Sequence, residues 1–131
     1  MLNRSKQKTK LIERAPEERR KDFLEVNDGY SLTEAVSEAD RCLQCRNAPC
    51  IQGCPVAIDI PGFIKAIQEK DLERSWEILY ATNRLPAICG RVCPQEKQCE
   101  ERCTVGKIKN SEPVAIGRLE RFTADWKRKA G

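Results

Sequence analysis

Two short runs contain all eight cysteines of this 131-residue chain. The first, CLQCRNAPCIQGCP, has the spacing C-x2-C-x4-C-x3-C-P, and the second, CGRVCPQEKQCEERC, has C-x3-C-P-x4-C-x3-C. The chain has no histidine, and only 5% of its residues are aromatic. A small domain with so few large apolar side chains gains much from internal cross-links. The cysteines therefore constrain the fold and the function more than any other feature.

The rest of the composition narrows the classes of protein to which the chain can belong. The formal net charge of +4 is too small to indicate nucleic-acid binding, and the basic excess is concentrated in the first 14 residues. We find no signal-peptide pattern and no apolar segment of about 20 residues. We therefore expect a cytoplasmic protein that binds neither nucleic acid nor membrane. In the cytoplasm, grouped cysteines serve metal or redox chemistry more often than structural disulfides.

The remaining sequence predicts an all-α domain over residues 15–131, preceded by a flexible basic tail over residues 1–14. Helical periodicity recurs along the chain, whereas no segment alternates as a strand does. The first predicted helix follows Pro16 and includes Phe23, Leu24 and Val26. SLTE at 31–34 is a capping box that begins a helix leading to Cys42. Further helices are predicted over residues 59–70, 71–83 and 113–130.

Four explanations of the cysteines compete. Disulfides require a secretory setting that the N-terminus does not indicate, and ordinary core packing suits a lone thiol better than eight in two runs. Structural zinc is favoured by the C-x2-C of Cys42 and Cys45, but the C-x4-C and C-x3-C spacings fit it poorly. A run that opens with C-x2-C and closes with C-x3-C-P is typical of bacterial ferredoxins, although the middle spacing is longer here. We expect two [4Fe–4S] clusters, with a zinc-stabilised, non-redox interaction module as the alternative.

The spacing also predicts how two clusters lie beside each other. Residues four apart on a helical turn point the same way but lie about 5–6 Å apart, so they can serve neighbouring clusters. Pro55 and Pro94 lack an N–H and end a regular helix after the preceding cysteine. Gly53 and Gly90 permit close backbone approach near the expected sites.

The segments EADRCLQCRNAPCIQGCPVAIDIPGFI, LPAICGRVCPQEKQCEERC and EPVAIGRLERF resemble the N-terminal iron–sulfur domain of the glutamate synthase small (β) subunit family. The same domain opens dihydropyrimidine dehydrogenase and the large subunit of the bifurcating NADH-dependent ferredoxin–NADP oxidoreductase. The resemblance covers roughly residues 14–126. It implies an α-helical ferredoxin fold, in which short helices surround two [4Fe–4S] clusters.

The resemblance also implies a ligand set for each cluster. The residues expected to hold cluster 1 are Cys42, Cys45, Cys50 and Cys103. The residues expected to hold cluster 2 are Cys54, Cys93, Cys99 and Glu120. In the family the last of these donors is a Gln or Glu on the final helix, so Cys89 is expected to be a non-ligand, although its spacing from Cys93 alone would nominate it.

The function implied by the resemblance is electron transfer. The chain has no glycine-rich phosphate-binding loop, so we expect FAD and NADPH to bind only in the rest of a parent oxidoreductase of glutamate synthase small-subunit type. The domain would relay single electrons to or from an FAD/NAD(P)H-binding domain in the same or a partner chain. A glutamate synthase large subunit or a ferredoxin is expected as the other redox partner. Clusters move electrons and do not themselves transform a substrate, so the domain alone is not expected to be catalytic.

Overall fold

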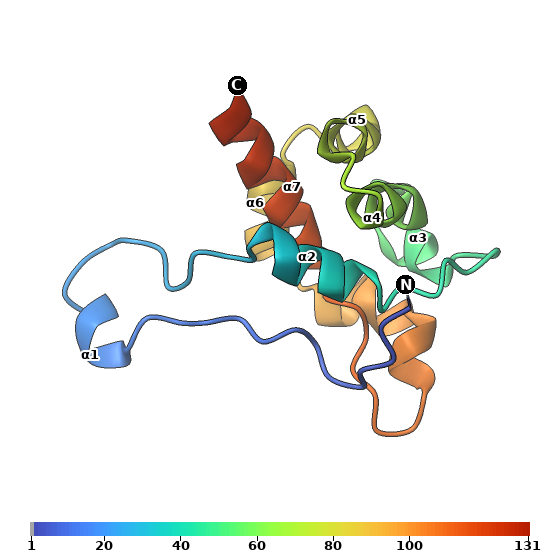
Figure 1. Ribbon diagram of the computed structural model, residues 1–131, viewed down its shortest axis with the longest axis horizontal. Helices are drawn as coiled ribbons and strands as arrows, with labels where there is room; N and C mark the ends of the chain where they lie inside the picture. The colour runs from blue at the N-terminus through green and yellow to red at the C-terminus, as the bar shows by residue number, and fades with distance from the viewer. Residues whose placement is uncertain (1) are drawn as a thin grey trace.

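The computed structural model describes residues 2–131, and within that range the protein is all-α (Figure 1). The helices are α1 (Pro16–Arg19), α2 (Leu32–Ala39), α3 (Pro49–Gly53), α4 (Ile60–Gln68), α5 (Leu72–Thr82), α6 (Pro86–Val92), the 3₁₀ helices η1 (Gln95–Lys97), η2 (Glu100–Arg102) and η3 (Thr104–Lys107), and α7 (Ile116–Ala130). The β pairing in these residues is one isolated bridge between Glu13 and Asn27. The all-α prediction is confirmed. No helix between residues 2 and 131 has the length and apolar character needed to cross a bilayer.

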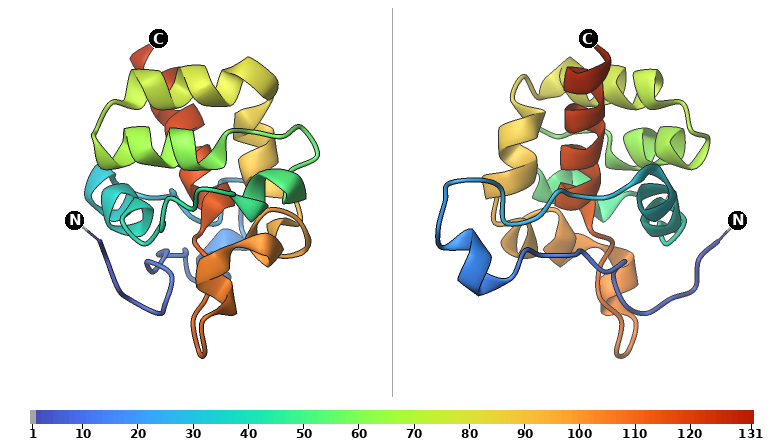
Figure 2. Two further views of the ribbon diagram at one scale, coloured as in Figure 1. Left: turned by 90° about the vertical axis from the view of Figure 1, so that its right-hand side faces the viewer. Right: turned by 60° about the vertical axis from the view of Figure 1, so that its left-hand side comes forward.

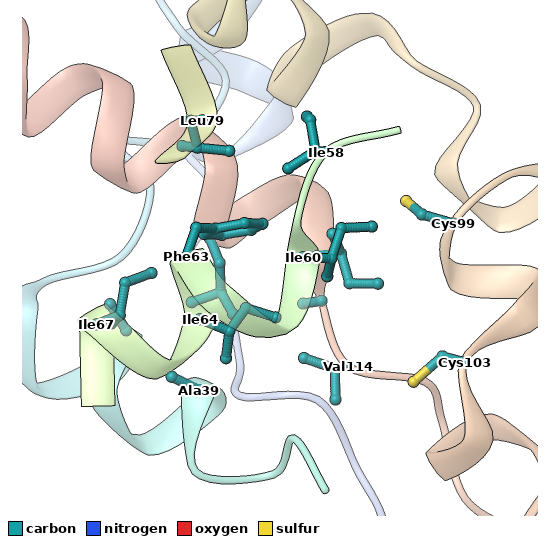
Figure 3. Close-up of a cluster of buried hydrophobic side chains, with 14 of the residues drawn as sticks. Ala39, Ile58, Ile60, Phe63, Ile64, Ile67, Leu79, Cys99, Cys103 and Val114 are labelled. Carbon is teal, nitrogen blue, oxygen red and sulfur yellow. The ribbon is translucent and has the colours of Figure 1, made fainter. Parts of the chain in front are cut away.

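The core lies where α4 and α5 pack side by side and α7 crosses them (Figure 2). Phe63, Ile64 and Ile67 of α4 are fully buried, together with Leu79 of α5 and Leu119 of α7. Figure 3 shows that this cluster continues to Cys99 and Cys103 at one side. The cysteine-bearing segments are therefore part of the core rather than an appendage to it.

The helix starts follow the capping signals in the sequence. The Ser31 side chain accepts from the backbone N–H of Glu34, and the Glu34 carboxylate accepts from the N–H of Ser31 at 2.7 Å. The Asp59 side chain caps α4 by accepting from the N–H of Gly62, and the Asp71 side chain caps α5 by accepting from the N–H of Arg74. The predicted capping box is confirmed. The last helix begins at Ile116, three residues later than predicted.

Two glycines allow the short helices to pack closely. A Cβ on Gly90 would lie 2.7 Å from the backbone nitrogen of Arg121, so α6 rests directly on α7. A Cβ on Gly53 would lie 2.5 Å from the carbonyl oxygen of Gln98, just before η2. The predicted close approaches are confirmed. Helix α6 was not among the predicted helices, and it forms with Pro86 in its first turn, where the missing N–H costs nothing.

The first predicted helix is wrong beyond Arg19. Helix α1 has four residues and lies on a loop away from the other helices (Figure 1). Phe23 is fully exposed and Leu24 is also exposed, so no apolar surface stabilises a longer helix there. An ion pair of 2.6 Å between Arg14 and Asp22 holds the loop in a different conformation.

A buried ion pair fastens the N-terminal segment to the domain. Glu38 and Arg41 are joined at 2.7 Å, and both side chains are fully buried. Glu38 accepts from the N–H groups of Thr9 and Ala115, while Arg41 donates to backbone carbonyls that include those of Ser5 and Glu112. These bonds bring residues 5–9 and the segment before α7 against α2. The flexibility expected of residues 1–14 stays a prediction, and Met1 lies outside the described residues.

Candidate metal centres

Four cysteines from three parts of the chain line one cavity, here called hollow 1. Cys42 follows α2, Cys45 lies in the next turn, Cys50 belongs to α3 and Cys103 follows η2. The walls between them are largely aliphatic: Leu43, Ile60, Ile64, Val105, Val114 and Ile116. The structure thus brings together the whole donor set predicted for cluster 1.

A second cavity, here called hollow 2, is lined by Cys54, Cys93, Cys99 and Glu120. These are the donors predicted for cluster 2. Cys89 of α6 also lines hollow 2, so five potential donors surround it. Its walls are more polar than those of hollow 1 and include three amide side chains: Asn83, Gln95 and Gln98.

Helix α3 and helix η2 stand between the two hollows and contact each other. Cys50 lines hollow 1 while Cys54 lines hollow 2, and Cys103 and Cys99 divide in the same way. The two members of each pair are four positions apart, the spacing expected for cysteines that serve neighbouring clusters. The arrangement therefore suits two neighbouring groups, and ligation by these residues stays a prediction.

The thiols are crowded together without a compensating cation. Burial, with the nearby Cys103 and Cys42 adding to the effect, raises the pKa of Cys50 to about 12. Burial likewise raises the pKa of Cys99 to about 12, with Glu100 and Cys54 adding to the effect. No lysine or arginine of the described chain lines either hollow. A positively charged metal group would supply the missing charge and displace the thiol protons.

Glu120 is a buried carboxyl group, not the solvated surface acid that its sequence context alone would indicate. Its exposed fraction is 6%. Burial raises its pKa to about 7, and a hydrogen bond from Asn83 acts in the opposite direction. The Asn83 amide nitrogen lies 2.7 Å from Oε1 of Glu120. The side chain therefore lies at hollow 2 with one oxygen already held.

The donors do not converge as they would around a single ion. Among residues 2–131, no three or more Cys, Asp or Glu side chains surround a point that would fit one metal ion. Tetrahedral zinc requires four donors about 2.0–2.3 Å from one centre. The ligands of a [4Fe–4S] cluster are spread around a larger group. Which kind of metal centre these donors hold stays a prediction at this point.

Sequence reasoning missed the amide side chains of hollow 2. Asn83 accepts a hydrogen bond from the Cys89 thiol at 3.7 Å, and the Gln95 amide donates to the carbonyl of Cys89 at 3.1 Å. No spacing rule connects an asparagine at the end of one helix with a glutamate 37 residues later. The only feature of the sequence that could have indicated a role for Asn83 at this site is its position six residues before Cys89.

Comparison with known proteins bears on this geometry. Residues 19–131 match the family model described as dihydropyrimidine dehydrogenase domain II, 4Fe-4S cluster. The chain belongs to this family. Membership in the 4Fe-4S domain family confirms the resemblance drawn from the cysteine segments. It also shows that the chain is an iron–sulfur domain of the kind found in dehydrogenase and glutamate synthase-type oxidoreductases, which implies electron transfer.

Individual relatives agree with the family assignment. The chain is 38% identical over 107 residues to the NAD-dependent dihydropyrimidine dehydrogenase subunit PreT of Escherichia coli K12, covering 82% of this chain and 26% of the relative. It is 40% identical over 108 residues to the glutamate synthase [NADPH] small chain of Azospirillum brasilense, covering 82% of this chain and 22% of the relative. The chain thus spans about a quarter of the length of these relatives.

Proposed function

We propose that this chain is an electron-transfer domain with two [4Fe–4S] clusters, relaying single electrons between an FAD/NAD(P)H-binding domain and a second redox partner. The observation that carries the proposal is the pair of adjacent hollows, each lined by four donors of one predicted set. Membership in the 4Fe-4S family supports the kind of cluster. The number of clusters and the ligand assignment are part of the proposal.

In this proposal the four cysteines of hollow 1 hold one cluster, while Cys54, Cys93, Cys99 and Glu120 hold the other. A [4Fe–4S] cluster supplies reversible one-electron chemistry when bound. The protein determines where each cluster is held. Because α3 and η2, together with the residues that cap them, each place one cysteine at either hollow, these two short helices would set the separation of the clusters.

The partners proposed for the domain follow from its relatives. We propose a parent NAD(P)H-dependent oxidoreductase of glutamate synthase small-subunit type, with FAD and NADPH bound in a domain of the same or a partner chain. A glutamate synthase large subunit or a ferredoxin would be the other redox partner, and the cytoplasm would be the location. The names of the relatives, an NAD-dependent dehydrogenase subunit and an NADPH-dependent glutamate synthase small chain, support the nucleotide link.

Metal and sulfide analysis of anaerobically purified protein tests the two-cluster proposal. We expect about eight iron and about eight acid-labile sulfide per chain, a brown colour that dithionite bleaches, and two EPR signals after full reduction. Stoichiometric zinc without sulfide would overturn the proposal in favour of a non-redox module. Without a flavin domain, the protein should not oxidise NADPH with an artificial dye as acceptor.

The choice between Glu120 and Cys89 as ligand requires its own test. Glu120→Ala should alter the EPR signal or the potential of one cluster, or convert that cluster to a [3Fe–4S] form, while the other cluster is unchanged. Cys89→Ala should retain the full iron content. The reverse pattern, with iron lost only in Cys89→Ala, would show that Cys89 is the ligand and Glu120 is not.

A further inference from the structure

Asn83 lies between the two side chains that compete for the same position at hollow 2. It directly follows α5 and is 5% exposed. Its amide nitrogen donates to Oε1 of Glu120 at 2.7 Å, and its amide oxygen accepts from the thiol of Cys89 at 3.7 Å. One amide group therefore contacts both of the candidate fourth donors.

The orientation of this amide is set by a third contact. The amide oxygen of Asn83 also accepts from the backbone N–H of Leu85 at 2.9 Å. If oxygen and nitrogen were exchanged, the NH₂ group would face the N–H of Leu85, and two donors would oppose each other. The oxygen must face Leu85 and Cys89, so the NH₂ group must face Glu120.

This orientation affects the two donors in opposite ways. Among the described residues, Asn83 is the only hydrogen-bond partner of the Glu120 carboxylate, so Oε2 is available to a metal while Oε1 is held. Cys89 instead uses its S–H to donate to Asn83, and it must give up that hydrogen bond before it can bind iron. A thiolate is the usual ligand of an iron–sulfur cluster, so some feature of the site has to favour the carboxylate.

We propose that Asn83 selects the fourth ligand of hollow 2, presenting Glu120 to the iron and holding Cys89 back. The inference rests on the proposed function, because it takes hollow 2 as the site of a cluster. Asn83 is a positioning residue in this proposal: it acts through the two donors and does not itself bind the metal. Groups of this kind orient ligands and tune metal sites in many metalloproteins.

A double-mutant cycle in the cluster-loaded protein tests the proposal. The four forms are wild type, Cys89→Ala, Asn83→Ala and Asn83→Ala/Cys89→Ala, each assayed anaerobically for iron content, EPR signals and the midpoint potentials of both clusters. Cys89→Ala alone should match wild type. Asn83→Ala should retain its iron but change the EPR signal and lower the potential of one cluster, because the more covalent Cys89 thiolate replaces the carboxylate.

The double variant gives the decisive result. With Asn83 and Cys89 both absent, the fourth iron should become labile, and the cluster should lose about one iron to give a [3Fe–4S] form. If Cys89→Ala has the same small effect with and without Asn83, the two residues are not coupled and the proposal is overturned. If wild type shows about four iron and one EPR signal, the proposed function fails for hollow 2, a result separate from the outcome of the cycle.

Two further variants separate selection from folding. Asn83→Asp keeps the acceptor for Leu85 and Cys89 but removes the donor to Glu120, so it should lose the fourth iron without gaining Cys89 as a ligand. Gln98→Ala is the matched control, because Gln98 is another amide of hollow 2 with no hydrogen bond to either donor. It should retain the fourth iron, with a smaller change of the EPR signal than Asn83→Ala causes. An equal spectral change in Gln98→Ala and Asn83→Ala would show a general effect of polarity and overturn the proposal.

Discussion

Hollow 1 and hollow 2 both receive cysteines that lie in or directly beside α3 and η2, and they differ in the rest of their linings. Aliphatic residues of α4 and of the segment before α7 close hollow 1, and its candidate donors are four cysteines. Hollow 2 is closed by α6, α7 and the end of α5, and it contains amides, a carboxyl group and a fifth potential donor in Cys89. The cysteine spacing thus places sulfur atoms at both hollows. The remaining lining residues determine which other donors could compete to bind a cluster.

The difference in walls implies a difference in redox behaviour. Ligand type, hydrogen bonding and solvent exposure all tune the potential of an iron–sulfur cluster. A cluster held by four thiolates among aliphatic side chains therefore has a different potential from one held partly by a carboxylate among amides. When the two potentials differ, a transferred electron resides mainly on the cluster with the higher potential.

Removing one cysteine from each hollow makes the largest change. Cys45→Ala affects hollow 1 and Cys93→Ala affects hollow 2, and neither residue belongs to the shared helices α3 and η2. Each variant should fall from about eight iron to about four per chain and lose a different EPR signal. Loss of the same signal in both variants would show that the two hollows serve one metal group.

Loss of a charged side chain should lower the free energy of unfolding more beside hollow 1 than beside hollow 2. Arg41→Met leaves the Glu38 carboxylate without its ionic partner in the core, at a cost of about 3–5 kcal/mol. Arg91→Met near hollow 2 removes ion pairs to Glu25 and Asp125 that are partly open to solvent, at a cost of about 1 kcal/mol or less. Urea unfolding followed by circular dichroism measures both.

The control for this comparison is the double variant Glu38→Gln/Arg41→Met. It removes the uncompensated charge and should recover part of the stability lost in Arg41→Met. Equal destabilisation by Arg41→Met and Arg91→Met would show that burial does not distinguish the two ion pairs.

Two glycine variants should distinguish packing that affects both hollows from packing that affects hollow 2 alone. Gly90→Ala forces α6 away from α7, and Gly53→Ala forces α3 away from the segment before η2. Overpacking of this kind costs about 1–3 kcal/mol. Gly90→Ala should change the EPR signal of the hollow 2 cluster alone, whereas Gly53→Ala should change both signals. Identical spectra for the two variants would show that Gly53 and Gly90 affect the same hollow or hollows.

The smallest effect is expected in the exposed loop that carries α1, away from both hollows. The hydrogen bond from Arg14, with the backbone N–H of Leu24, lowers the pKa of Asp22 from 3.8 to about 2. Because the folded value is the lower one, the ion pair stabilises the loop above pH 3.8, and this contribution is lost as the pH falls through about 2. An NMR titration of the Asp22 carboxyl carbon measures it, and Arg14→Ala should return the pKa towards 3.8. An unchanged pKa in that variant would rule out the ion pair.

Local patterns predicted much of this protein. The capping box at Ser31 and the caps at Asp59 and Asp71 depend on neighbours within a few residues, so helix starts could be read from the sequence. The glycines near the cysteines were identified as points of close approach because glycine has no Cβ, whichever segment packs against it. The predicted helix beyond Arg19 failed because periodicity does not reveal whether a partner surface exists for Phe23.

The sequence by itself determined an all-α domain with cysteines spaced for adjacent metal groups, because cap signals and i, i+4 geometry act over one or two helical turns. Glu120 and Cys89 as competitors came from the family resemblance, and the sequence named no residue that acts on both. Only the tertiary structure showed that Asn83 lies between them and that Glu38 and Arg41 tie three distant segments together. These contacts join residues far apart in the chain, and burial decides their strength, so they arise only when the helices pack.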